Sequence, residues 1–407
     1  MKRTLIKDLP IYILEEVSVS GYVERQKKMK GFSFITLRDR SGVAQIIVSS
    51  KTLPESMSSE YCARFIGRVI NNEQSQYGGI EIQASSSEVL SRGMRGSNIP
   101  LRDDGKISLE KLLDRRPSTL RFPSQREAIK LQSEILRIAR TRLEEQDFIE
   151  VQTPKIIVEG GAGGSDSFHI DYFDEDAWLA QSPQLYHQML MGAHERIFEV
   201  GPVFRAQNYA TQRHVNEVTS LDVSMAFPES LDELRCMATT LVSQMIDARK
   251  EVPERSVVTV NYLDAMKVIN GTGAQRMSGP EKLDLYKKLA PRGDELLVLQ
   301  RTPASTTNFT VLTGENGLSE NFKIIYCGQE VCSGSMRISS FEEIKYSMKD
   351  YGINSNEFGS FLEAYKCGLP PHGGFSIGIN RLTANIIGVE NIKEVIAFPR
   401  DPRRLRP

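Results

Sequence analysis

The segment Phe198–Phe227, FEVGPVFRAQNYATQRHVNEVTSLDVSMAF, is the most informative part of the sequence. Apolar, β-forming residues stand at both ends and a charged loop stands between them, so the segment predicts strand, loop and strand. Arg205 lies at the end of the first strand, and Arg213 and His214 lie in the loop. Guanidinium groups match phosphate oxygens, so such a loop can fold over a triphosphate. Alone, however, these arginines would more often be solvated charges of a hairpin.

A second segment with similar chemistry lies near the C-terminus. His372–Leu382 reads HGGFSIGINRL, a glycine-rich strand that runs into a helix with Arg381 in its first turn. Glycines allow a nucleotide to lie close to the backbone. The guanidinium of Arg381 can stack on a purine or bind its phosphates. Because glycine-rich strands often enter helices, this segment alone indicates little.

The first 92 residues have the pattern of a β domain. Val17–Val23, Gly31–Leu37 and Val43–Val48 predict short strands separated by polar turns, which are typical of a small barrel. Residues 93–124 are rich in Arg, Gly, Pro and Ser and lack sustained periodicity, so we interpret them as a hinge.

From residue 125 onward, helices and strands alternate irregularly. Gln125–Glu145 carries apolar residues at helical spacing, and Phe148–Pro154 (FIEVQTP) predicts a strand that ends at a proline. No regular βαβ order follows, which favours an antiparallel sheet with packed helices and an α+β fold class. Further strands are expected at Trp178–Ala180, Ile197–Val200, Leu221–Phe227, Ile324–Tyr326 and Gly374–Ile379, and further helices at Pro183–Met191, Leu231–Lys250, Glu342–Tyr351 and Arg381–Gly388.

Length and composition bound the classes of protein. A chain of 407 residues is too long for one ordinary core and predicts two domains. The net charge of -1 gives no general attraction to nucleic acid, so such a surface must come from local patches. No segment has the length of a membrane span or the core of a signal peptide, and the five scattered cysteines are typical of reduced thiols. We therefore expect a cytoplasmic protein without a membrane partner.

Together, FIEVQTP and the two arginine-bearing segments resemble, in order, the three signature motifs of class II aminoacyl-tRNA synthetases. The stretches LAQSPQLY, FEVGPVFRA, TSLD, LPPHGGF and FPRDPRRLRP are similar to archaeal-type aspartyl-tRNA synthetases of the aspartyl/asparaginyl subgroup. The resemblance covers nearly the whole chain. It implies a five-stranded OB-fold barrel for anticodon binding at residues 1–92, the hinge at 93–124, and a class II catalytic domain at 125–407, with an antiparallel β-sheet flanked by helices.

The resemblance also implies an activity and its site residues. The chain would activate aspartate or a close analogue with ATP and Mg2+, transfer it to tRNA of the Asp or Asn type, and act as a homodimer. Arg205 and Arg381 would be catalytic. ATP would contact Arg205, Gln207, Arg213, His214, Glu330 and Arg381, with Glu330 on the metal. The amino acid would contact Glu159, Ser182, Gln184, His187, Asp222 and Arg337. The anticodon would contact Arg25, Phe34 and Gln45.

Several positions depart from the family pattern, and they gather around adenine, magnesium and the substrate side chain. Lys323 stands where a second magnesium carboxylate is usual, although an ammonium group cannot ligate a metal. Val218 replaces an aromatic residue that stacks on adenine, and His187 replaces a lysine that helps bind the substrate carboxylate. The other departures are Gln207, Ser224, Thr307–Thr310 and Asn380.

These departures leave three hypotheses open. The chain is an ATP-dependent aminoacyl-tRNA ligase, a diverged paralogue that binds tRNA without catalysis, or a paralogue that activates an amino acid for a different acceptor. Pyrophosphate exchange that depends on an amino acid separates the first from the second. Failure to bind tRNA together with adenylate formation would favour the third, whereas Phe34 and Gln45 count against it.

Overall fold

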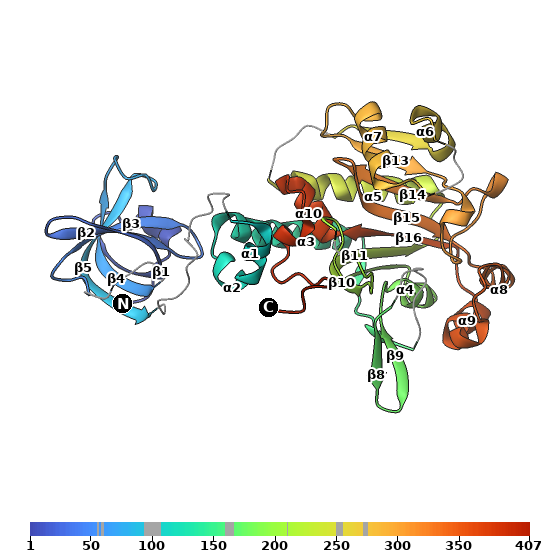
Figure 1. Ribbon diagram of the computed structural model, residues 1–407, viewed down its shortest axis with the longest axis horizontal. Helices are drawn as coiled ribbons and strands as arrows, with labels where there is room; N and C mark the ends of the chain where they lie inside the picture. The colour runs from blue at the N-terminus through green and yellow to red at the C-terminus, as the bar shows by residue number, and fades with distance from the viewer. Residues whose placement is uncertain are drawn as a thin grey trace. The chain divides into compact units, whose positions relative to one another are not determined.

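The computed structural model divides the chain into two compact units, Met1–Arg102 and Asp103–Pro407. It describes all residues except 55–56, 58–60, 93–106, 159–166, 210, 250–254 and 272–275. Figure 1 shows the elements of both units.

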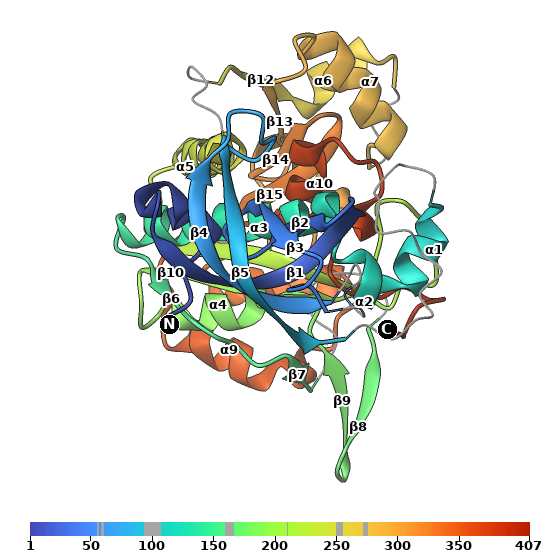
Figure 2. The ribbon, with the colours of Figure 1, turned by 90° about the vertical axis from the view of Figure 1, so that its left-hand side faces the viewer.

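Unit 1 is a closed five-stranded barrel in the order β1-β2-β3-β5-β4, which can be followed in Figure 2. The strands are antiparallel except β3 and β5, which pair in parallel, and the antiparallel pairing of β4 with β1 closes the barrel. Its elements are the 3-10 helix η1 (Ile6–Tyr12) and the strands β1 (Glu16–Lys28), β2 (Phe32–Arg38), β3 (Val43–Ser49), β4 (Cys62–Asn71) and β5 (Ile80–Ser91). The predicted barrel and its three predicted strands are confirmed.

The core of the barrel is formed by every second residue of its strands, because buried and outward-facing residues alternate. In β2 the buried residues are Ser33, Ile35 and Leu37, and the residues between them face outward. β1 extends to Lys28, and beyond a bulge between Val23 and Arg25 its basic residues Arg25, Lys27 and Lys28 pair with β2. The basic side chains therefore stand on a strand and not in a turn.

Unit 2 is built on an eight-stranded sheet in the order β12-β13-β14-β15-β16-β11-β10-β6. The strands from β13 to β10 are antiparallel, as predicted, whereas β12 and β6 at the two edges pair in parallel. The sheet strands are β6 (Ile149–Glu150), β10 (Arg196–Phe204), β11 (Glu217–Ala226), β12 (Val257–Asn261), β13 (Leu296–Gln300), β14 (Asn321–Tyr326), β15 (Gln329–Arg337) and β16 (His372–Gly378). A small separate sheet holds β7 (Ile156–Ile157), β9 (Glu175–Leu179) and β8 (His169–Tyr172).

Two long helices, α3 and α5, cover one face of the large sheet and form the main core with it. Helices α6 and α7 belong to a separate core with β13, and α8 and α9 to another. None of the described helices is long and apolar enough to cross a membrane. The α-helices are α1 (Leu109–Asp114), α2 (Arg116–Thr119), α3 (Pro123–Glu144), α4 (Gln184–Leu190), α5 (Leu231–Ile246), α6 (Tyr262–Val268), α7 (Gly279–Leu289), α8 (Phe341–Asp350), α9 (Gly359–Lys366) and α10 (Ile379–Ile387).

The stretch 93–124, interpreted as a hinge, is described from residue 107 onward. There it contains α1 and α2, which pack into unit 2. Arg116 is 2% exposed, and its Nε donates to the carbonyl oxygen of Ala397 at 2.8 Å. Arg404 adds an ion pair to Asp114 at 2.7 Å. This half of the stretch is therefore fastened to the C-terminal segment, and residues 93–106 lie outside the described residues.

The glycines of the C-terminal segment yield a test of the sheet. A Cβ on Gly374 would lie 2.4 Å from the carbonyl oxygen of Val223, so the strands would have to part. We predict that Gly374→Ala lowers the free energy of unfolding of unit 2 by roughly 1–3 kcal/mol, as overpacking does. The control is Gly378→Ala, whose Cβ meets nothing closer than 3.8 Å. Urea unfolding followed by the fluorescence of Trp178, the single tryptophan, measures both. Equal stability of the two variants would contradict the prediction.

Candidate active site

The face of the large sheet opposite α3 and α5 is polar, and this follows from alternation in the central strands. In β11, Ser220, Asp222 and Ser224 alternate with apolar residues that enter the core. Register then aligns one residue from each of five neighbouring strands, namely Lys323, Ser333, Ser376, Asp222 and Glu199. We call these five residues the polar row. Ser333 is solvent-exposed although β15 is central, so this face is open above it.

Basic groups gather beside the Lys323 end of the polar row. Arg381 donates from Nη1 to the carbonyl oxygen of Glu330 at 2.7 Å. Burial lowers the pKa of Arg381, and the positive charges of Arg205 and Arg213 lower that pKa further. The pKa of His214 is lowered by burial first and then by the same three arginines. The structure therefore brings together the arginine after β10, the loop arginine and the arginine that opens α10.

Backbone contacts position the loop that carries these groups. Asn216 donates from Nδ2 to the carbonyl oxygens of Arg205 at 2.7 Å and Gln207 at 3.1 Å. His214 shares a hydrogen bond of 2.6 Å with Thr211. Val218, where the resemblance expects an aromatic residue, packs against a small apolar cluster with α10 and the C-terminal segment. It therefore serves the core and offers no stacking surface.

Glu330 does not fit the role of a magnesium ligand that the resemblance implies. Its Oε2 lies 2.5 Å from Nζ of Lys282 and 3.5 Å from Nζ of Lys323. Burial raises the pKa of Glu330, but the charges of Lys323 and Lys282 outweigh it and hold that pKa well below its usual range. Magnesium binds at about 2.0–2.1 Å from its oxygen ligands, where it would meet both ammonium groups. The surroundings of Glu330 therefore do not suit a magnesium ion.

Arg337 marks the other side of the polar face, at the end of β15. Burial lowers the pKa of Arg337 to about 10, against the opposing effects of Tyr365 and Asp222. Burial also raises the pKa of Asp222, which hydrogen bonds from Ser220 and Ser376 oppose. Arg337 and Asp222 are thus electrostatic neighbours, one cation and one anion on the same face of the sheet. Such a pair can bind the two opposite charges of an amino acid.

Helix α4 brings further predicted residues to this face. Gln184, its first residue, donates from Nε2 to Oγ1 of Thr310 at 2.5 Å. The hydroxyl of Ser182 accepts from the backbone N–H of Gln184 at 3.2 Å. Glu159, also predicted to bind the amino acid, lies outside the described residues. Thr310 belongs to the departing stretch Thr307–Thr310, and its hydroxyl now orients Gln184.

His187 is held within a buried network. It is 1% exposed, with Nδ1 3.2 Å from the hydroxyl of Ser224 and Nε2 3.4 Å from Glu199. Glu199 also accepts from Nζ of Lys155 at 2.5 Å and from Thr153 at 2.7 Å. Burial raises the pKa of Glu199, but these partners outweigh it and lower that pKa to about 2. Two departures, His187 and Ser224, are therefore partners of each other.

The anticodon residues implied by the resemblance share the outer face of unit 1. Phe34 lies opposite Lys27 and Ile47, and it alternates with buried residues, so it is not part of the barrel core. Arg25, Thr36 and Gln45 form the adjacent rung. Gln45 donates from Nε2 to Glu81 at 3.0 Å, which fixes its amide on this face. An aromatic ring flanked by basic side chains suits single-stranded nucleic acid.

Sequence reasoning missed several residues of the site. Lys282 lies on α7, in a region that carries no motif, and Arg276 lies just before that helix. Lys155 and Glu199 meet across 44 positions of sequence. Pairings of this length leave no local pattern, so only the fold shows them. A Cβ on Gly373 would lie 2.3 Å from Cδ1 of Leu234, so this glycine also makes room for the packing of α5 against the sheet.

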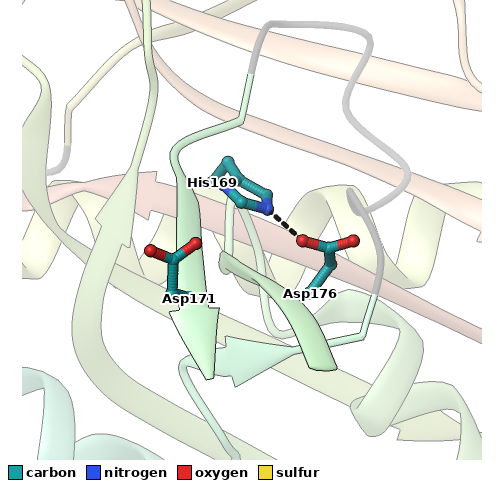
Figure 3. A group of neighbouring side chains, drawn as sticks. All are labelled: His169, Asp171 and Asp176. Atoms are coloured by element: carbon teal, nitrogen blue, oxygen red, sulfur yellow. Dashed lines mark hydrogen bonds and ion pairs between the residues drawn. The ribbon is translucent and has the colours of Figure 1, made fainter. Parts of the chain in front are cut away.

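One group of possible metal ligands lies away from this site. Among the described residues, His169, Asp171 and Asp176 on the β8–β9 hairpin bring ligand atoms within 4.8 Å of one another, as Figure 3 shows. All three are exposed, and His169 already pairs with Asp176 at 2.6 Å. Exposed acidic groups commonly lie together without an ion, so we assign no function to this cluster.

Two family models match the chain. Residues 108–402 match the family described as tRNA synthetases class II (D, K and N), and residues 17–90 match the OB-fold nucleic acid binding domain. The chain is 34% identical to the aspartate--tRNA(Asp/Asn) ligase of Thermus thermophilus over the whole of both chains. It is 33% identical to the aspartate--tRNA(Asp) ligase of Pyrococcus abyssi over 97% of this chain and 96% of the other.

Solved structures show the same fold. The asparaginyl-tRNA synthetase of Pyrococcus horikoshii complexed with asparaginyl-adenylate superposes with a TM-score of 0.91 at 23% identity, covering all of both chains. The aspartyl tRNA synthetase of Entamoeba histolytica gives a TM-score of 0.84 at 25% identity, covering 100% of this chain and 93% of the other.

The buried network around Glu199 yields a pH-dependent test. Because the folded-state pKa is depressed from 4.5 to about 2, the ionised group stabilises the fold above the unfolded pKa. That contribution is lost as the pH falls through about 2. We predict that the wild type has a higher free energy of unfolding in urea than Glu199→Gln at pH 5. This difference should decrease by up to about 3 kcal/mol between pH 5 and pH 2. Exposed Glu195→Gln is the matched control. A gap of constant size would contradict the assignment.

Proposed function

This chain belongs to the class II tRNA synthetases (D, K and N), and we propose on that basis that it activates aspartate with ATP and transfers it to tRNA. The observation that carries the proposal is the polar face, which joins the arginine cluster of Arg205 and Arg381 to Arg337. Phosphates suit one end and an acidic side chain suits the other. Relatives at 33–34% identity are named aspartate--tRNA ligases, which supports the same choice.

Adenylate formation requires that the protein position the two substrates and stabilise the developing negative charge, and it requires no protein nucleophile. The substrate's α-carboxylate attacks the α-phosphate of ATP, the bond to the β-phosphate breaks, and pyrophosphate leaves. Arg205 and Arg381 stabilise the negative charge that builds on the α-phosphate. In the second step a hydroxyl at the 3′ end of tRNA attacks the acyl carbon, and AMP leaves with the electron pair of the broken bond. Class II synthetases use ATP with Mg2+ in general.

The side chain of the substrate is recognised by Arg337. A guanidinium binds a carboxylate through two parallel hydrogen bonds, which favours aspartate over a neutral analogue. Asp222 supplies the opposite charge for the α-ammonium group. Burial lowers the pKa of nearby His372 to about 4, and Arg337 lowers it as well, so that imidazole is neutral at pH 7. Arg337 is then the charge that selects an acidic side chain.

Unit 1 binds the anticodon of a tRNA of the Asp or Asn type through Phe34, Gln45 and Arg25. We also propose a homodimer in the cytoplasm. The support for a dimer is exposed apolar surface on unit 2. Ile149, on the edge strand β6 of the large sheet, is 51% exposed. Ile156 on β7 is 47% exposed, and Val158, just after β7, is 71% exposed. Such a surface is usual at an interface between copies.

The first test of the function concerns Arg337. We predict that Arg337→Met raises the KM for aspartate in ATP–pyrophosphate exchange roughly 100-fold, since a charge-assisted, two-pronged contact is lost. Arg292→Met, an exposed arginine of the same unit, is the control. If no amino acid, including asparagine, supports exchange by the wild type, the ligase proposal is wrong. If asparagine is preferred, the choice of aspartate is wrong.

The second test concerns the barrel. We predict that Phe34→Leu lowers kcat/KM for tRNA roughly tenfold or more, because stacking on one base is worth about 1–3 kcal/mol. Pyrophosphate exchange, which needs no tRNA, is the internal control and should not change. Charging that is unaffected by Phe34→Leu would remove the anticodon function from this face.

A further inference from the structure

We propose that the ammonium groups of Lys282 and Lys323 take the place of a protein-bound metal ion, so that this pocket binds the triphosphate of ATP without magnesium. The proposal rests on the proposed function for the identity of the nucleotide. It goes beyond that function because it assigns the neutralisation of phosphate charge to two side chains of this chain.

Both lysines contact the same carboxylate oxygen, Oε2 of Glu330. The ammonium group of Lys282 approaches it at 2.5 Å and that of Lys323 at 3.5 Å. All three side chains are 12–16% exposed, so the group is sheltered yet reachable from solvent. A metal ion on that oxygen would stand among like charges at contact distance, where repulsion in a partly desolvated site is strong. The ammonium groups and a metal ion therefore exclude each other here.

Helix α7 holds Lys282 firmly in this place. Ser278 and Glu281 form a capping box at its start. The helix packs on the β14–β15 turn so closely that a Cβ on Gly328 would lie 2.3 Å from Leu283. Gly279 faces Arg213, whose Nη1 would lie 3.1 Å from a Cβ there. Lys282 thus belongs to a rigid element that also contacts the loop expected to cover the triphosphate.

The charge of the whole cluster agrees with this assignment. Electrostatic coupling links the basic residues to one another and to the carboxylate of Glu330. The basic residues are Arg205, Arg213, Arg276, Lys282, Lys323 and Arg381. Each ammonium group has three N–H donors, so donors remain for phosphate oxygens after the contact with Glu330. The excess of positive charge suits a triphosphate that arrives without a metal ion.

The experiment is calorimetric titration of ATP into the full-length protein, once in EDTA and once in excess magnesium. We expect the wild-type Kd in EDTA to lie within about threefold of the Kd in magnesium. Lys323→Met and Lys282→Met should each weaken binding in EDTA about tenfold, the loss of one charge-assisted hydrogen bond. In the double variant Lys282→Met/Lys323→Met, magnesium should restore much of the loss, because neither ammonium group then occupies Glu330. Lys267→Met, an exposed lysine on α6, is the control and should match the wild type in both buffers.

The outcomes separate this proposal from the proposed function. Wild-type binding only in magnesium, with aspartate-dependent pyrophosphate exchange intact, overturns the lysine proposal and leaves the ligase standing. Binding in EDTA without exchange by any amino acid supports the lysines and overturns the ligase. Absence of ATP binding in both buffers overturns both. Because the wild-type comparison needs no substitution, a variant that fails to fold does not remove the test, and melting temperatures identify such a variant.

Discussion

The structure of unit 2 depends on pairing the carboxylates that stand inside its central sheet. Glu199 and Asp222 are buried in the middle of neighbouring strands, where an unpaired charge would be costly. The partners of Glu199, a lysine, a threonine and a histidine, outweigh the effect of burial and lower its pKa, whereas hydrogen bonds from Ser220 and Ser376 offset only part of the rise that burial causes in the pKa of Asp222. These pairings fix which face of the sheet can be polar, and the two long helices take the other face.

Because the pairing of these carboxylates makes one face of the sheet polar, the charged residues of the site lie along that face. Basic side chains collect at the ends of β10 and β16, where the strands give way to a loop and a helix. A single arginine stands at the far end, beside a buried neutral histidine. Replacements on both sides of the site form local pairs. His187 pairs with Ser224, and Lys323 joins Lys282 on Glu330.

Much of the fold could be predicted because its signals are local. Alternation in Phe32–Arg38 and Val43–Ser49 marks the barrel, and the strand–loop–strand pattern around Arg205 marks the centre of the large sheet. The contact of Lys282 with Glu330 could not be assigned from sequence, since the two residues are 48 positions apart and no local pattern links them. Residues 107–119 were mistaken for linker because their helices are short and their burial depends on the distant C-terminal segment.

That last attachment has a consequence for synthesis on the ribosome. The barrel contains all of its own strands within the first 91 residues, so it can fold as soon as it emerges. The guanidinium of Arg116 instead donates hydrogen bonds to the carbonyl oxygens of Glu394, Ile396 and Ala397. These acceptors are synthesised long after Arg116. Unit 2 therefore completes its folding only after residues 394–397 have been synthesised, and a chain terminated before them leaves the charge of Arg116 without its acceptors.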